Sequence, residues 1–186
     1  MNQVKIRKLV FGEGRPKICV PVTGRTREEI ALRTAELKAA KPDLAEWRAD
    51  WYEEVFDRGK LETTLAWLRE ELGELPLLVT FRTREEGGEQ NVSPEDYAAF
   101  LRTVLMSGQA DLIDVELFRG EKLLRDICKE AKAQGVKVIA SSHDFEKTPA
   151  KEEILARLIR MQDCGADLLK LAVMPQDAAD VLTLLS

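Results

Sequence analysis

The chain has 186 residues, of which 33 are acidic and 28 basic, so its formal net charge is −5. This length fits one domain or at most two small ones, and the acidic balance argues against a nucleic-acid partner, which would need a basic surface. No apolar run approaches the roughly 18 residues of a membrane span. The amino-terminal residues lack the apolar core and cleavage site of a secretory signal, so we expect a cytoplasmic protein without a membrane or nucleic-acid partner.

Three cysteines and one histidine limit the metal and redox chemistry of the chain. Cys19, Cys128 and Cys164 lie far apart in the sequence, and together with His143 they do not form a metal-binding pattern. We therefore predict no metal site and interpret all three cysteines as reduced packing residues, as is usual in the cytoplasm.

Short apolar runs alternate with segments of helical periodicity along the whole chain. Runs rich in Val, Ile and Leu are typical of parallel strands that are buried on both faces. The predicted strands are residues 17–22, 44–50, 77–82, 111–117, 137–142 and 167–173. The predicted helices are residues 26–40, 57–72, 94–107, 120–134 and 150–164, and a last one that begins within 175–186.

Local chemistry supports these boundaries. Thr26 and Ser93 can cap helix amino termini, and a glycine follows four of the helices, at Gly73, Gly108, Gly135 and Gly165. Strand centres lie about 30 residues apart, which is the size of a βα unit. Before the first strand, residues 4–10 alternate in polarity; they predict either a small hairpin that plugs one end of a barrel, with residues 15–18 as a further pairing segment, or a frayed tail.

Six consecutive βα units fit either an open doubly wound sheet or part of a (β/α)8 barrel. Residues 23–26, after the first strand, lack the glycine spacing of a dinucleotide site, and the chain has no phosphate-binding lysine loop. Nucleotide binding is therefore the function that the sequence favours least. The choice between the two folds depends on where the polar residues of the strands lie.

Charged side chains occur at positions where a buried strand should be apolar. Strand alternation places Glu46, Arg48 and Asp50 on one face, where they either line a site or pair with one another inside a barrel. Arg82 ends the third strand, and Glu86 follows it in a charged loop with two glycines. This loop either contributes to a site or is simply solvated.

The fourth and fifth strands also carry polar groups. Asp114 and Glu116 share a face, and we expect them to hold neighbouring basic groups rather than to catalyse. His143 is the only histidine and lies at the carboxyl end of the fifth strand, where the active sites of βα barrels form. We therefore predict a catalytic role for His143.

Lys170 lies in the middle of the sixth strand among apolar neighbours. Burial of an ammonium group favours the uncharged amine, which is the nucleophile needed for imine formation with a ketone. The alternative is a lysine on an edge strand that reaches solvent. With His143 as the proton carrier, these groups suit Schiff-base chemistry on an anionic carbonyl compound, and they do not separate aldol cleavage from dehydration.

Motifs from all six strands occur in a fixed order along the chain. They are Lys17-Ile-Cys-Val-Pro-Val, Glu46-Trp-Arg-Ala-Asp, Thr80-Phe-Arg-Thr, Glu86-Gly-Gly, Asp114-Val-Glu, Ser141-Ser-His-Asp-Phe and Asp167-Leu-Leu-Lys-Leu-Ala. In these motifs and their spacing the chain resembles the type I 3-dehydroquinate dehydratases, the Schiff-base enzymes of the shikimate pathway of aromatic amino acid biosynthesis.

The resemblance implies a hydro-lyase that converts the small molecule 3-dehydroquinate to 3-dehydroshikimate by syn elimination of water, without a metal or organic cofactor. It implies that Lys170 forms the imine, that His143 is the general acid and base, and that Glu86 orients or assists His143. It further implies a set of substrate-binding residues: Glu46, Arg48 and Arg82. Some members of the family carry a serine where this chain has Pro21.

The chain is shorter than the family's complete barrel, which needs roughly 250 residues. We therefore expect an incomplete (β/α)8 barrel, a single domain over residues 1–186 that lacks the last two βα units, the family's substrate-carboxylate arginine and its closing loop. Activity should be weak or absent, and open strand edges should favour a homo-oligomer, most simply a dimer. The alternatives are a non-catalytic structural or assembly fragment and, less favoured, a Schiff-base aldolase.

Overall fold

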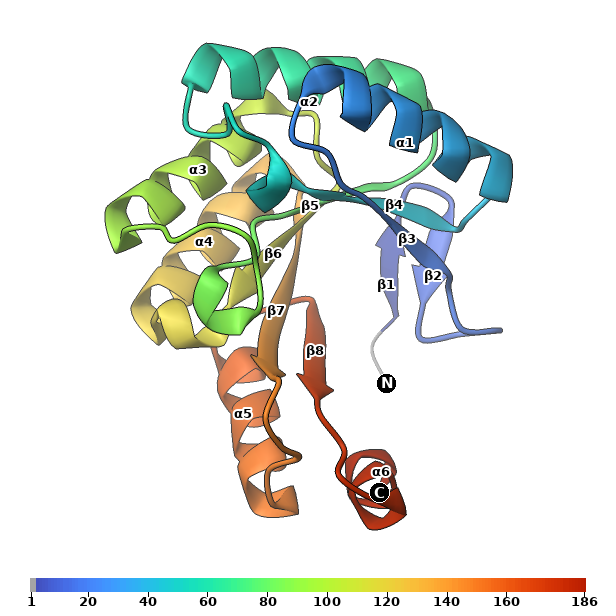
Figure 1. Cartoon of the computed structure of the whole chain (residues 1–186). Coiled ribbons are helices and arrows are strands. Elements are labelled where there is room, and N and C mark those ends of the chain that lie inside the picture. Colours follow the sequence, from blue (N-terminus) through green and yellow to red (C-terminus); the bar gives the residue numbers. More distant parts are fainter. Residues whose placement is uncertain (1–2) are drawn as a thin grey trace.

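The computed structural model describes residues 3–186. Its main element is a curved sheet of six parallel strands in the order β3-β4-β5-β6-β7-β8, in which each strand pairs with its neighbours along the chain (Figure 1). A separate antiparallel hairpin, β1-β2, precedes the sheet. Sequential parallel strands linked by helices form a βα barrel, so the structure confirms the predicted partial barrel.

Helices and strands alternate from β3 onward. The strands are β1 Val4–Ile6, β2 Leu9–Phe11, β3 Cys19–Val22, β4 Leu44–Arg48, β5 Leu77–Thr80, β6 Leu112–Glu116, β7 Lys137–Asp144 and β8 Leu168–Val173. The α-helices are α1 Arg27–Ala40, α2 Arg58–Leu72, α3 Pro94–Ser107, α4 Glu121–Gln134, α5 Lys151–Asp163 and α6 Ala178–Leu185. Short 3-10 helices follow three strands: η1 Ala49–Trp51, η2 Arg84–Glu86 and η3 Leu117–Arg119.

The predicted boundaries agree with these elements to within a few residues. Thr26 and Ser93 cap α1 and α3 by accepting hydrogen bonds from the backbone N–H groups three residues on. Three strands end two residues away from the prediction; one of them, β5, ends at Thr80, so Arg82 follows the strand. β4 ends at Arg48 because the chain turns into η1, and β7 continues to Asp144, which places His143 inside the strand.

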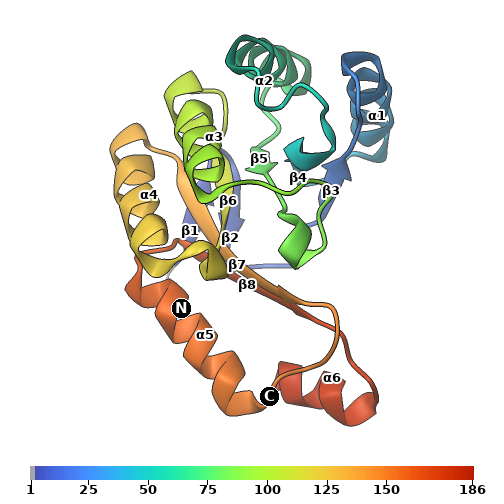
Figure 2. The ribbon, with the colours of Figure 1, turned by 60° about the vertical axis from the view of Figure 1, so that its left-hand side comes forward.

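The main hydrophobic core lies between the sheet and the helices on its outer side. Figure 2 shows α1, α2, α3 and α4 along this side. Trp47 of β4, Leu65 of α2, Leu101 of α3 and Ile127 of α4 are all fully buried there. Because strand side chains alternate between faces, the other residues of each strand line the barrel interior.

The β1-β2 hairpin covers the barrel interior at the amino ends of the strands. Ile6 of β1 is buried in a small apolar cluster with Leu44, Leu78 and Leu112, the first inward residues of β4, β5 and β6. The Arg7 Nε donates to Asp111 at the start of β6, at 2.6 Å. The structure thus confirms the predicted hairpin, and the alternative of a frayed tail is wrong for residues 3–11. Residues 15–18 do not pair with the hairpin as a further strand.

The two edges of the sheet have one strand neighbour each in the part of the chain that the structure describes, at β3 and at β8. Near β8, α6 buries none of its residues, and its Leu182 and Leu185 are 67% and 77% exposed. No described helix is long and apolar enough to cross a membrane.

The three cysteines are free, but only two of them fit the predicted role. Cys128 and Cys164 are buried packing residues. Cys19 is exposed, so its prediction as a packing residue is wrong. The reason is its place on β3, an edge strand that has no partner on its other side within the described residues.

Candidate active site

The inner face of the sheet becomes polar toward the carboxyl ends of the strands. The parallel register sets Glu116 of β6 beside Ser141 of β7, and Ser141 beside Lys170 of β8. Glu46 and Arg48 lie on the same face of β4, two residues apart. The barrel interior therefore has an apolar layer at the amino ends of the strands and a charged layer at their carboxyl ends.

A pocket of about 90 Å³ opens on this charged layer. Its walls are Glu46, Arg48, Arg82, Glu86, Gly87, His143, Phe145 and Lys170. All six residues that the sequence proposed for the site therefore line one pocket. Within residues 3–186 no group of three or more His, Cys, Asp or Glu side chains is arranged to hold a metal ion.

Glu86 and His143 form the most closely connected pair in the pocket. The η2 turn brings Glu86 to the carboxyl end of β7, where its Oε2 lies 2.8 Å from the His143 Nδ1 and accepts the His143 backbone N–H at 3.0 Å. Both side chains are nearly buried, at 7% exposure for His143 and 6% for Glu86. The second Glu86 oxygen, Oε1, is buried and has no hydrogen-bond partner among the described residues.

The surroundings favour the neutral imidazole. Burial lowers the pKa of His143 well below its ordinary value, and the positive charges of Arg82 and Lys170 lower it further. Burial raises the pKa of Glu86. With Nδ1–H donating to Glu86, the lone pair of a neutral His143 is on Nε2. The geometry thus gives His143 the form that can accept a proton.

Arg82 is the centre of a buried ion-pair network. Its guanidinium lies 2.9 Å from Asp114 and 2.8 Å from Glu116, and it donates to Ser141 at 3.0 Å. Its side chain is only 4% exposed. Asp114 and Glu116 therefore hold a basic group, as the sequence predicted, and Arg82 lines the pocket with its Nη1 hydrogen-bonded to Glu116 and Ser141.

Glu46 and Arg48 are each held by one neighbour. Glu46 Oε1 accepts a hydrogen bond from the Thr80 hydroxyl at 2.7 Å. Arg48 donates from Nε and Nη2 to the two oxygens of Asp50, both at 2.8 Å. Each side chain is thus oriented while some of its polar atoms stay available to a ligand.

Lys170 lies in the pocket but differs from the prediction in one respect. The sequence indicated a buried lysine among apolar neighbours, whereas Lys170 is exposed. β8 is an edge strand of the described sheet, so no further strand covers the lysine on that side. Burial of its amine, the favoured interpretation, is therefore wrong for this chain, and the alternative of an edge-strand lysine that reaches solvent is confirmed. Lys170 nevertheless lies beside the other site residues.

Sequence reasoning did not include two wall residues, Phe145 and Gly87, in the site. Phe145 stacks near the His143 ring at a centroid distance of 6.3 Å. A Cβ at Gly87 would lie 2.4 Å from the Phe145 ring, which is a steric clash. Gly87 also has a φ of +83°, a backbone conformation that residues with a side chain rarely adopt. The glycine pair after Glu86 was the available signal for this close approach.

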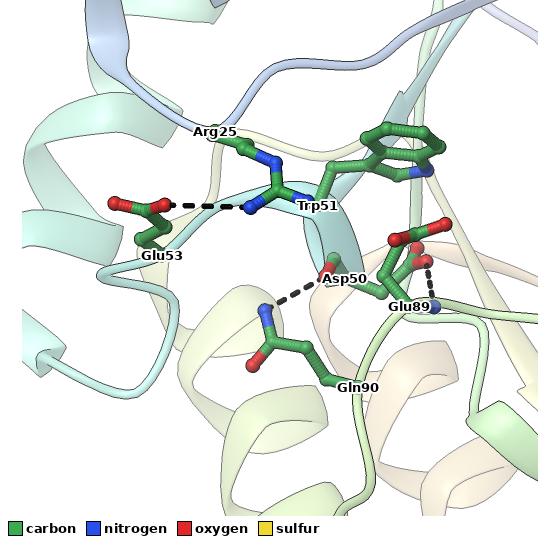
Figure 3. A pocket seen from close by; sticks show the side chains of 6 residues that line it. All are labelled: Arg25, Asp50, Trp51, Glu53, Glu89 and Gln90. Atoms are coloured by element: carbon green, nitrogen blue, oxygen red, sulfur yellow. Dashed lines mark hydrogen bonds and ion pairs between the residues drawn. The ribbon is translucent and has the colours of Figure 1, made fainter.

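A second cavity, of about 250 Å³, is shown in Figure 3. Its lining residues are Arg25, Asp50, Trp51, Glu53, Glu89 and Gln90. Asp50 belongs to this cavity and also binds Arg48 of the active-site pocket. The Asp50 carboxylate thus lines the second cavity and hydrogen-bonds a residue that lines the active-site pocket.

Comparison with known proteins identifies the family of this chain. Residues 18–186 match the family described as type I 3-dehydroquinase. The chain belongs to the type I 3-dehydroquinase family. The resemblance seen in the sequence motifs is therefore confirmed.

Members of the type I 3-dehydroquinase family are similar to this chain over nearly its whole length. A 3-dehydroquinate dehydratase of Syntrophotalea carbinolica is 51% identical over 185 residues, which are 100% of this chain and 73% of the relative. The crystal structure of a type I 3-dehydroquinate dehydratase from Clostridium difficile, covalently modified with comenic acid, is 46% identical with a TM-score of 0.96, over 98% of this chain and 73% of that one. A 3-dehydroquinate dehydratase from Enterococcus faecalis is 45% identical with a TM-score of 0.94, over 98% and 76%.

Proposed function

We propose that this chain acts on 3-dehydroquinate and dehydrates it to 3-dehydroshikimate through a Schiff base on Lys170. The observation that carries this proposal is the single pocket in which the Lys170 amine, the His143–Glu86 pair and two arginines meet. An amine beside a neutral imidazole supplies the nucleophile and the proton carrier that imine-based elimination requires.

In the proposed reaction Lys170 releases a proton and its amine attacks the substrate ketone; the carbinolamine hydroxyl then takes up a proton and leaves as water, which gives an iminium ion. The iminium acidifies the adjacent C–H group, and His143 Nε2 removes that proton to give an enamine. The enamine then expels the hydroxyl group of the next carbon, which takes the proton back from His143 and leaves as water. Hydrolysis of the remaining iminium releases the enone and restores Lys170. One base that serves both proton transfers explains a syn elimination.

The remaining pocket residues have supporting roles in this proposal. Glu86 fixes the Nδ1–H tautomer of His143, and its free Oε1 can accept a hydrogen bond from a substrate hydroxyl or from the released water. Arg48 and Glu46 bind substrate hydroxyls with the polar atoms that Asp50 and Thr80 leave available. Arg82 balances the charge of the buried carboxylates. No metal or organic cofactor takes part in these steps.

Turnover by a chain of these 186 residues should be slow. The pocket is open beside Lys170, and no described residue beyond β8 reaches it. A substrate that has no protein contacts on the side beyond β8 is bound less tightly and oriented less well than one that the protein surrounds. We therefore expect imine formation together with low dehydration rates.

We further propose a homodimer in the cytoplasm. The exposed Leu182 and Leu185 of α6 and the two unpaired strand edges of the described sheet are surfaces that a second copy could cover. Light scattering should give twice the mass of one chain, and a compact monomer would contradict the dimer.

The function is tested by incubating the chain with 3-dehydroquinate and following the ultraviolet absorbance of the conjugated enone product. Aldol substrates serve as the comparison for a Schiff-base aldolase. Enone formation, even if slow, supports the dehydratase. Cleavage of aldol substrates alone would favour the aldolase, and neither reaction, with no rise in melting temperature on adding 3-dehydroquinate, would favour a non-catalytic structural fragment.

A further inference from the structure

Asp50 is a fully buried carboxylate whose two oxygens accept four hydrogen bonds. Oδ1 accepts from the Arg48 Nε at 2.8 Å and from the Arg82 backbone N–H at 3.2 Å. Oδ2 accepts from the Arg48 Nη2 at 2.8 Å and from the Glu89 backbone N–H at 3.2 Å. One side chain therefore joins the end of β4, the end of β5 and the segment that follows η2.

The bidentate contact sets the direction of the Arg48 guanidinium. A guanidinium has five N–H donors in a fixed plane, and Asp50 takes two of them on one edge. Within residues 3–186 the Arg48 side chain makes hydrogen bonds to Asp50 alone. The other edge, with three N–H groups, is left for a ligand in the pocket that Arg48 lines.

Asp50 also holds the segment that carries Glu86, through its carboxylate and through its backbone carbonyl group. Besides the Glu89 N–H, the Gln90 side chain donates to the Asp50 carbonyl at 2.7 Å and to that of Tyr52 at 3.1 Å. Figure 3 shows Gln90 and the Glu89 backbone directed at Asp50. Glu86 lies three residues before Glu89, so these contacts limit how far it can move from His143.

We propose that Asp50 is a positioning residue for the active site, which holds Arg48 for the substrate and ties the Glu86 segment to β4. This inference rests on the proposed function, because it assumes that Arg48 binds the substrate. Asp50 itself is not among the residues that line the pocket, so its effect on the substrate must pass through the groups it holds.

The first test is the Asp50→Asn variant, which keeps the shape but replaces one acceptor oxygen by an NH2 group that faces the Arg48 donors. The measured quantity is the 3-dehydroquinate concentration at which half of the chain is trapped as a borohydride-reduced adduct. Loss of a charged hydrogen-bonded contact should raise this half-saturation concentration about tenfold or more.

The matched control is Asp111→Asn, because Asp111 also binds two arginines and a backbone N–H, but at the amino ends of the strands. That variant should melt at a lower temperature with unchanged half-saturation.

A double-mutant cycle separates positioning from a general loss of structure. If Asp50 acts on binding partly through Arg48, the half-saturation of the double variant Asp50→Asn with Arg48→Ala should rise by clearly less than the product of the two single effects, and what remains of the Asp50→Asn effect reflects the loosened Glu86 segment. Effects that multiply, or an Asp50→Asn variant that traps substrate like the unmodified chain, would overturn the inference.

A second measurement decides the inference if the unmodified chain traps no substrate, a result that would count against the proposed function itself. Hydrogen–deuterium exchange reports the Arg82 and Glu89 amides without any ligand. Asp50→Asn should speed exchange in residues 81–90 more than Asp111→Asn does. Equal exchange in the two variants would show that Asp50 does not hold this segment.

Discussion

The Nδ1 atom of His143 lies 2.8 Å from Glu86 Oε2, and the same oxygen accepts the backbone N–H of His143 at 3.0 Å. Two contacts to one carboxylate oxygen fix both the ring and the strand that carries it. They leave Nε2 as the free nitrogen of a neutral ring. This relationship is the basis of the proton-transfer role proposed for His143.

The protonation of His143 can be measured directly, because it is the only histidine in the chain. With isotope-labelled histidine, one NMR signal should titrate well below the ordinary pKa of about 6.5, because burial and the charges of Arg82 and Lys170 disfavour the imidazolium. The ring therefore stays neutral as the pH falls through 6.5, and the proton-abstraction step should persist at pH values where an ordinary histidine is already charged. Lys170→Met removes one of the cations and should move the pKa upward. A titration at 6.5 in both proteins would contradict this account.

Loss of Arg82 should destabilise the fold strongly. Arg82→Met leaves the buried Asp114 and Glu116 without their cation, which typically costs about 3–5 kcal/mol. Urea unfolding measures this loss. The control is Arg102→Met, which removes an exposed pair with Glu130 and should cost less than about 1 kcal/mol. Similar losses in both variants would mean that the Arg82 network does not stabilise the fold.

The hairpin should contribute to global stability rather than form a detachable tail. Ile6→Ala removes a buried side chain from the cluster of Leu44, Leu78 and Leu112 and should cost about 2–5 kcal/mol. Lys5→Ala, on the exposed side of the same strand, should change the free energy of unfolding by less than about 0.5 kcal/mol. An Ile6→Ala protein as stable as Lys5→Ala would show that the hairpin does not pack on the barrel.

The turn after Glu86 requires a glycine at position 88. A Cβ there would lie 1.8 Å from the Arg82 carbonyl oxygen, so Gly88→Ala must displace the segment that carries Glu86. We expect weaker trapping of 3-dehydroquinate and a lower melting temperature. Gly59→Ala, inside the first turn of α2 with no close backbone contact, should retain trapping and stabilise the helix by a few tenths of a kcal/mol to about 1 kcal/mol. Full trapping by Gly88→Ala would show that this turn is not needed to place Glu86.

Much of the fold could be predicted because strand and helix patterns depend on neighbours in the sequence. The apolar run of β6 and the Ser93 cap of α3 report local burial and local hydrogen bonds, and both are found where the sequence placed them. The six proposed site residues line one pocket because the carboxyl ends of sequential parallel strands meet at one end of a barrel, which is why the sequence could group them. The helix predicted over residues 26–40 ends at Ala40 as expected, although the residue that closes it, Lys41, adopts a φ of +50° without being a glycine.

What the sequence left out depends on contacts between distant elements. The exposure of Lys170 follows from β8 being an edge of the described sheet; the sequence offered this as the alternative, but the apolar neighbours of Lys170 favoured burial. The role of Asp50 depends on backbone N–H groups 32 and 39 residues away, at Arg82 and Glu89. Such contacts are set by the packing of whole strands and loops, so a local pattern does not encode them.

The most direct test of the proposed chemistry is borohydride reduction of the chain in the presence of 3-dehydroquinate, followed by intact-mass and peptide mass spectrometry. The account predicts a mass gain of one reduced adduct, located on Lys170 and absent from the Lys170→Ala variant. No adduct, or an adduct that persists in Lys170→Ala, would contradict a Schiff base at this residue.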